Sequence, residues 1–172
     1  MSQNRGRVRS FWGSEMGISM FTAIHVALSL VGILSGLVAV AGMFKSNRLA
    51  GWTLLFLATT IATSVTGFGF HREHVLPSHI VGIISLVLLA VAVLALYVFA
   101  LRRAWRWIYV VSAVASLYLN VFVLIVQGFL KVPALHALAP TQNDPPFAIA
   151  QGIALIAFIA IGTAAARKFR PG

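Results

Sequence analysis

Long apolar runs alternate with short polar or basic breaks along the chain. We find five runs without Asp, Glu, Lys or Arg, over residues 16–44, 49–70, 76–101, 107–130 and 147–166. Each run is long enough for the roughly 20 helical residues that cross a hydrocarbon core about 30 Å thick. Stretches such as SLVLLAVAVLALYVFAL lack the alternation of apolar and polar residues that marks strands of a membrane barrel. The pattern predicts an all-α integral membrane protein with five transmembrane helices.

The first three breaks between these runs are short, with the sequences KSNR, HREHV and RRAWR. Connections of this length place consecutive helices side by side and antiparallel. We therefore expect a single five-helix bundle over residues 16–166. Residues 1–15 form a basic amino-terminal tail, expected to be poorly ordered or to lie at the membrane interface, and residues 167–172 form a basic carboxy-terminal tail.

The fourth break is longer and contains four prolines, in the sequence KVPALHALAPTQNDPP. Its spaced apolar residues predict a short interfacial helix that begins at Pro133, because proline is tolerated in the first turn of a helix. We expect this segment to form an ordered cap over one end of the bundle. Asp144 precedes two prolines and is predicted to cap the free amides at the start of the fifth helix.

Composition supports the membrane assignment and excludes several kinds of chemistry. Of the 172 residues, 60% are hydrophobic and only 9% are charged, whereas a soluble domain carries about 25% charged residues. The net charge of +10 does not indicate nucleic acid, because the basic residues lie in short clusters between apolar runs. The chain has no cysteine, and its three acids lie in separate segments. These absences exclude a Cys nucleophile and paired-carboxylate catalysis, so an enzyme is not favoured.

The distribution of basic residues predicts the orientation in the membrane. One side carries Lys45, Arg48, Arg102, Arg103, Arg106, Arg167, Lys168 and Arg170, and the other carries Arg5, Arg7, Arg9, Arg72 and Lys131. The positive-inside rule places the side with eight in the cytoplasm, so the amino terminus is expected in the periplasm. If translation begins at Met16 or Met20, the count becomes eight against two. The expected cytoplasmic aromatic belt consists of Trp52, Tyr97, Trp105, Trp107 and Tyr109.

Polar residues in the apolar runs follow helical spacing. On the first helix, His25, Ser29, Gly32 and Gly36 share one face. The fourth helix carries a second stripe, made of Ser112, Ser116, Asn120 and Gln127. In lipid an unpaired amide or imidazole costs several kcal/mol, so we expect these stripes to face each other inside the bundle. The Gly32 and Gly36 pair is also a GxxxG pattern, which favours close helix packing.

The histidines are the candidate cofactor ligands, and all five fall on the predicted outer side or in the outer leaflet. His25 and His79 lie inside different spans, so they are candidate axial ligands of haem b. Thr66, Gln127 and Gln151 are the expected lining of that pocket. Imidazoles and a thioether also suit copper, for which the candidate ligands are Met20, His71 and His74. The preferred interpretation remains structural, with each histidine bonded to a neighbouring hydroxyl or carbonyl and no bound cofactor.

The segments TSVTGF, LPSHIVGIISL and WRWIYVVSAVASLYLNVFVLIVQGFLKVPALHALAPTQNDPPF resemble a group of short hypothetical multi-pass inner-membrane proteins of proteobacteria. The similarity covers the chain from about residue 16 to the last helix. It implies an inner-membrane location. The group has no assigned activity, so the resemblance implies no functional residue.

Three functions remain open from the sequence. The preferred one is a non-catalytic accessory or assembly component of a membrane complex, with the lipid bilayer and other membrane subunits as partners. The alternative is a redox or ligand-binding protein that holds haem b or copper at the outer-leaflet histidines. A small-solute transporter is third, because no span is visibly broken at mid-membrane and no buried charge marks an ion path.

Overall fold

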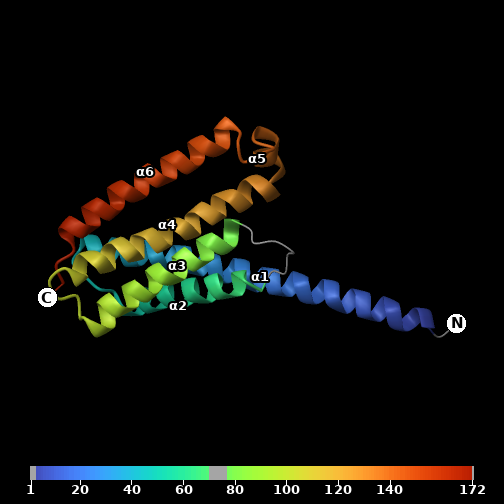
Figure 1. Ribbon diagram of the computed structural model, residues 1–172, viewed down its shortest axis with the longest axis horizontal. Coiled ribbons are helices and arrows are strands. Elements are labelled where there is room, and N and C mark those ends of the chain that lie inside the picture. Colours follow the sequence, from blue (N-terminus) through green and yellow to red (C-terminus); the bar gives the residue numbers. More distant parts are fainter. Residues whose placement is uncertain (1–2, 70–76, 172) are drawn as a thin grey trace.

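The computed structural model describes the backbone of residues 3–69 and 77–171, and the side chains of residues 20–69 and 79–171. The described chain is helical, without a β-strand (Figure 1). Its elements are α1 (Gln3–Phe44), α2 (Ala50–Gly67), α3 (Pro77–Val93), the π-helical turn η1 (Leu94–Val98), α4 (Trp105–Lys131), α5 (Pro133–Leu138) and α6 (Pro145–Lys168). The short helix predicted to begin at Pro133 is present as α5, and its position at the membrane interface stays a prediction.

Five segments of these helices are long and apolar enough to cross a membrane. They are Met20–Phe44, Ala50–Gly67, His79–Val98, Trp105–Lys131 and Pro145–Lys168. The predicted all-α five-helix membrane fold is therefore confirmed, with bounds within a few residues of those read from the sequence. Helix α1 already begins at Gln3, and its first part extends beyond the other helices (Figure 1). The backbone of residues 3–15 thus continues α1, and an interfacial position for this segment stays a prediction.

Helix α4 is central to the bundle and packs against α3, α6 and α1, while α2 packs against α1 and α3. The core forms where α1 to α4 meet and contains the fully buried Phe56, Leu89, Val110 and Leu117. Helix α6 is different, because its long contact is with α4 and only its carboxy-terminal part reaches the core, at Ala165 and Ala166.

Glycines allow the close approach of α1 to its neighbours. A Cβ atom at Gly36 would lie 2.7 Å from Leu117 Cδ1 and 2.8 Å from the Phe56 ring. At Gly32 it would lie 3.1 Å from Thr60 Oγ1. The predicted GxxxG pair therefore serves close packing, and it brings α1 against both α2 and α4.

The carboxy-terminal segment is fastened to the turn between α1 and α2. Ser46 Oγ donates to the Lys168 carbonyl oxygen at 2.9 Å and accepts from the Arg170 amide at 3.0 Å. Between these two contacts, Phe169 is fully buried and lies beside the Tyr109 ring, with centroids 5.9 Å apart. Two segments more than 120 residues apart in the sequence are thereby joined at one end of the bundle.

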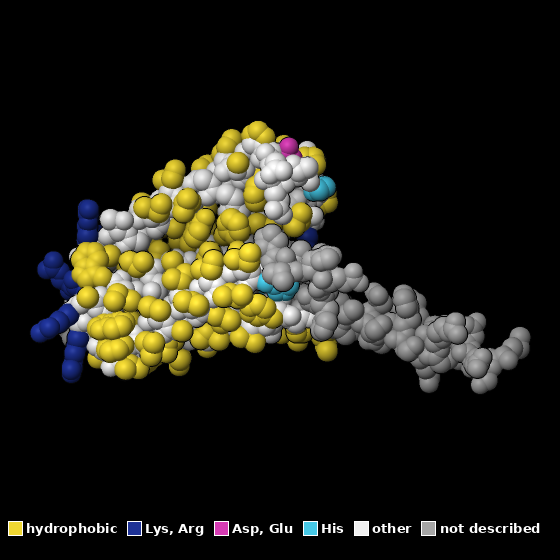
Figure 2. Space-filling view, in the orientation of Figure 1, with side chains coloured by type: hydrophobic (Ala, Val, Ile, Leu, Met, Phe, Trp, Pro, Cys, Tyr) yellow, Lys and Arg dark blue, Asp and Glu magenta, His cyan; other side chains and the backbone are white. Residues whose placement is uncertain are grey.

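Basic side chains gather at this same end, as Figure 2 shows. They come from the α1–α2 turn, the η1–α4 connection, the first turn of α4 and the carboxy-terminal end of α6 with the residues after it, and they are the eight that the sequence predicts on the cytoplasmic side. The α1–α2 turn and the η1–α4 connection contain five non-glycine residues with left-handed backbone conformations: Ser46, Leu49, Ala100, Leu101 and Arg103. The turns are therefore tight, and short polar bonds such as Leu49 N to Asn47 Oδ1, at 2.9 Å, hold them.

Of the residues predicted to form an aromatic belt, Tyr109 is buried, and the other four lie near the basic end. Trp52, Tyr97 and Trp107 are exposed near the basic end, and Trp105 stacks on Phe99 with ring centroids 3.7 Å apart. Tyr109 is only 2% exposed. It belongs to the core because the buried Phe169 and the carboxy-terminal segment cover it.

The side chain of Asp144 does not cap α6 as the sequence predicted. Its Oδ2 accepts from the amide and the hydroxyl of Thr141, at 2.7 and 2.9 Å. Pro145 and Pro146 have no N–H, so the first free amide is that of Phe147, and it donates to the Asp144 carbonyl oxygen at 3.1 Å. The carboxylate is thus used to close the turn before α6.

Candidate functional site

The main candidate site is a buried polar stripe between α1, α2 and α4, made of His25, Thr60, Thr63, Thr66 and Asn120. Three threonines of α2 recur every third residue, so they lie on nearly one face of the helix. Thr60 and Thr63 are buried, and Thr66 is half-buried. Thr66 was expected to line the histidine pocket and Thr60 was not, although the threefold spacing of hydroxyl residues is visible in the sequence.

His25 begins the stripe and is bonded to α2. Its Nδ1 lies 2.8 Å from Thr66 Oγ1. The Thr66 hydroxyl proton points to the Ala62 carbonyl oxygen at 2.7 Å, so Oγ1 is the acceptor and Nδ1–H the donor. Gly67 lies beside the ring, where a Cβ atom would make ordinary van der Waals contact with His25 Cε1 at 3.7 Å. His25 and Thr66, which the sequence placed around one pocket, are therefore in direct contact.

Asn120 forms the deeper part of the stripe. Its Nδ2 donates to Thr60 Oγ1 at 3.2 Å, which joins α4 to α2. Gly32 of α1 lies at the same place, because a Cβ atom there would be 3.4 Å from Asn120 Nδ2. Thr60 is six residues before Thr66, so this contact lies about 9 Å further along the helix. Three helices thus meet at one polar contact inside the membrane span.

Thr63 lies between these two contacts on α2. Its Oγ1 is buried and has no hydrogen-bond partner among the described residues. A hydroxyl in a helix usually bonds to a carbonyl three or four residues earlier, as that of Thr66 does. The stripe therefore holds two interhelical bonds with one unpaired buried hydroxyl between them.

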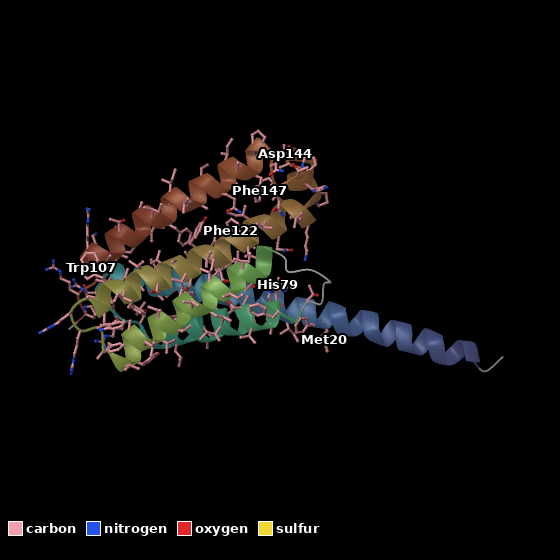
Figure 3. The ribbon with its side chains drawn as sticks, viewed as in Figure 1. Met20, His79, Trp107, Phe122, Asp144 and Phe147 are labelled. Atoms are coloured by element: carbon pink, nitrogen blue, oxygen red, sulfur yellow. The ribbon has the colours of Figure 1, made fainter. Side chains whose placement is uncertain are left out.

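His79, labelled in Figure 3, packs near the same end of α2. Its ring stacks on Phe68, the residue after α2, with centroids 5.7 Å apart and an interplanar angle of 13°. Phe68 follows the end of α2 at Gly67 and is two residues after Thr66. These contacts of the two imidazoles are therefore with different residues at this end of α2. They do not support a shared pair of axial ligands, and the haem hypothesis stays a prediction.

The two glutamines do not line the histidine region as predicted. Gln127 is exposed on α4. Gln151 lies between α6 and α4, where its Nε2 donates to the Phe122 carbonyl oxygen at 3.2 Å. Its Oε1 is buried and has no partner among the described side chains. Both residues lie in the parts of their helices nearest the α4–α6 connection, but the rotation of each helix directs them away from the histidines.

The copper hypothesis falls largely outside the described residues. His71 and His74 are in the segment that the structure does not describe, and Met20 is 66% exposed. Within the described part of the chain, no group of three or more His, Asp or Glu residues is placed to hold a metal ion. The copper ligands therefore stay a prediction.

Comparison with known proteins identifies no relative of this chain. No protein-family model, curated protein or solved structure shows significant similarity to the chain. The five-helix membrane fold and the polar stripe are consequently interpreted from their own geometry.

Proposed function

We propose that the chain is a non-catalytic accessory or assembly component of a bacterial inner-membrane complex. The observation that carries this proposal is that three pairs of polar side chains inside the spans bond from one helix to another. His25 bonds to Thr66, Asn120 to Thr60, and Ser64 Oγ to Ser85 Oγ at 3.2 Å. Such bonds hold transmembrane helices together. A rigid helical scaffold needs these contacts and no reacting group.

Helix α6 offers the surface through which such a component would contact a partner subunit. Its exposed residues include Ile149, Ile153, Ile156 and Ile159, and Ile156 is 69% exposed. Figure 2 shows hydrophobic side chains over this helix. Because lipid tails are as apolar as isoleucine, this face suits either lipid or another transmembrane helix.

Site-specific crosslinking in native membranes tests this function. We expect a photo-reactive side chain at Ile156 to yield one discrete heavier product that contains a second membrane protein. The matched control is Ile83 of α3, which is 55% exposed. Equal and diffuse products from both positions, together with purification of the chain alone in a mild detergent, would contradict an accessory role.

A cofactor-binding function is the second candidate, and the His25 contact favours it. Histidines that ligate metals commonly donate their other ring N–H to an oxygen, which fixes the ring and its tautomer. The bond from Nδ1–H to Thr66 Oγ1 has this form. Haem b or copper bound through Nε2 of His25 would supply redox chemistry. A Soret band or bound copper that is lost in His25→Ala and kept in His136→Ala would establish this function.

We further propose that the carboxy terminus lies in the cytoplasm. The eight basic residues at one end of the bundle support this orientation through the positive-inside rule. The resemblance to hypothetical proteobacterial inner-membrane proteins agrees with a bacterial inner membrane. A carboxy-terminal green fluorescent fusion should fluoresce, and an alkaline phosphatase fusion at the same position should be inactive. The reverse pair of results would invert the topology.

A further inference from the structure

A small cleft opens at the basic end of the bundle, away from the polar stripe. Its volume is about 110 Å³, and it is lined by Arg48, Ala50, Thr53, Leu96 and Tyr97. These residues come from the α1–α2 turn, the first turn of α2 and η1. Drug-sized ligands occupy about 300–1,000 Å³, so this cleft suits a fragment of the size of a phosphate group with its ester carbons.

The lining combines a cation with apolar walls. Arg48 and Tyr97 are exposed, whereas Leu96 and Thr53 are largely buried. The Thr53 hydroxyl donates to the Arg48 carbonyl oxygen at 2.7 Å, so it serves the turn. The groups left to recognise a ligand are a guanidinium and a phenol, which both donate to phosphate oxygens.

The charge around the cleft is of one sign. Lys45 belongs to the same turn as Arg48, and Ser46 fastens the basic segment of Lys168 and Arg170 to that turn. Asp144, the one acid whose side chain is described, lies at the opposite end of the bundle (Figure 3). No described carboxylate therefore neutralises Arg48, and the region attracts anions.

The cleft lies at the ends of two membrane spans, and this position favours a lipid over a soluble anion as its ligand. Ala50 is the first residue of one membrane span, and Leu96 and Tyr97 are near the end of another. The cleft thus lies at headgroup level, where the exposed Trp52 is also found. The same two helices keep Leu54 and Val98 exposed, at 58% and 64%, so acyl chains have an apolar surface to lie along.

We infer that this cleft binds the headgroup of an anionic phospholipid, with Arg48 and Tyr97 donating to its phosphate and the acyl chains lying along α2 and η1. A lipid satisfies the cation and the apolar walls together, whereas inorganic phosphate satisfies only the cation. This inference is independent of the accessory function, because a transporter or a cofactor protein would bind lipid at this cleft equally well.

Native mass spectrometry of the purified full-length protein tests the inference, with short-chain phosphatidylglycerol as the probe. We expect saturable binding of phosphatidylglycerol, and affinity for phosphatidylcholine about tenfold weaker. Arg48→Gln should weaken phosphatidylglycerol binding about tenfold, the loss of one charge-assisted hydrogen bond. The matched control Arg102→Gln removes the same charge from the exposed η1–α4 connection and should change binding less than about twofold.

A third variant tests whether binding needs the space of the cleft in addition to its charge. Ala50→Phe fills the space at the exposed start of α2 without changing any charge, and we expect it to weaken binding as much as Arg48→Gln. An equal loss of phosphatidylglycerol affinity in Arg48→Gln and Arg102→Gln would show that general surface charge attracts the lipid, and it would overturn the site. Unchanged binding in Ala50→Phe would also overturn it. Full competition by inorganic phosphate at equal concentration would assign the cleft to a soluble anion instead.

Discussion

The contact of α1 with α2 and the contact of α6 with α4 are built differently, although both belong to one bundle. At the first, a Cβ atom on Gly36 would overlap the Phe56 ring at 2.8 Å. At the second, a Cβ atom on Gly152 would meet nothing within 4 Å, and one on Gly162 would lie 3.3 Å from Val114. Helix α1 is therefore tightly enclosed, while much of α6 is not.

Side-chain hydrogen bonds also differ between the enclosed helix α1 and the more exposed helix α6. The α1–α2 contact contains the bond of His25 to Thr66, and the neighbouring α2–α4 contact contains that of Asn120 to Thr60. Helix α6 has the bond from Gln151 to a backbone carbonyl oxygen, and it leaves Gln151 Oε1 unpaired. Because lipid removes the hydrophobic drive between helices, close packing and hydrogen bonds determine how firmly each helix is held. We expect α6 to separate from the bundle before α1 does.

The largest effect should come from filling the tight contact. Gly36→Val places new atoms against Leu117 and Phe56, so it should lower the free energy of unfolding by about 3 kcal/mol. Gly152→Val adds the same atoms to α6 and should change the free energy of unfolding by less than about 0.5 kcal/mol. Reversible unfolding in bicelles measures both variants. Equal destabilisation would remove the contrast between the two contacts.

Removing buried volume should give the next largest effect. Leu117→Ala leaves a cavity where α1, α2 and α4 meet, and we expect a loss of about 2 kcal/mol. This is near the low end for soluble proteins, because the unfolded helix keeps its leucine in lipid and only the packing is lost. Ile156→Ala on the exposed face of α6 should cost less than about 0.5 kcal/mol. A larger loss at Ile156 would show that a partner or a second copy covers α6.

The polar stripe gives a smaller effect that a double-mutant cycle can isolate. Asn120→Ala and Thr60→Val each remove one side of the bond between α4 and α2. We expect a coupling energy of about 0.6 kcal/mol, the average for interhelical hydrogen bonds in a membrane protein. Thr163→Val is the control, because the Thr163 hydroxyl bonds only to the Ile159 carbonyl oxygen of its own helix. A coupling energy near zero would mean that the stripe does not hold the helices.

The smallest effect is expected at the polar contact of α6. Gln151→Met removes one hydrogen bond to the Phe122 carbonyl oxygen, and it also removes a buried oxygen that has no partner among the described residues. These two changes oppose each other, so the free energy of unfolding should change by less than about 0.5 kcal/mol. A loss above about 1.5 kcal/mol would show that Gln151 holds α6 as firmly as the stripe holds α2, contrary to the comparison.

The sequence alone was sufficient for the secondary structure and the layout of charge. Hydrocarbon thickness sets the length of each span, and the backbone in lipid must satisfy its own hydrogen bonds, so apolar runs without charges predict helices directly. Pro133 marked the start of α5 for an equally local reason. The grouping of eight basic residues followed from counting spans, because each span moves the chain to the other side.

The tertiary structure decided which polar groups meet. His25 bonds to Thr66, 41 residues away, and Asn120 bonds to Thr60, 60 residues away. Both pairs depend on how the packed helices are rotated and shifted relative to each other. Gln127 shared a helical stripe with Asn120 in the sequence, yet it is exposed, because the buried side of α4 at this end is that of Phe129, which packs against Phe147.

Burial at the basic end was also a tertiary property. Tyr109 looked like an interfacial aromatic residue, but the carboxy-terminal segment folds back and Phe169 covers it. The cleft at Arg48 likewise joins residues of a turn to η1, which lies almost 50 positions later in the chain. Helix formation depends on neighbours within four residues, whereas burial and partners depend on segments distant in sequence, and only packing brings those together.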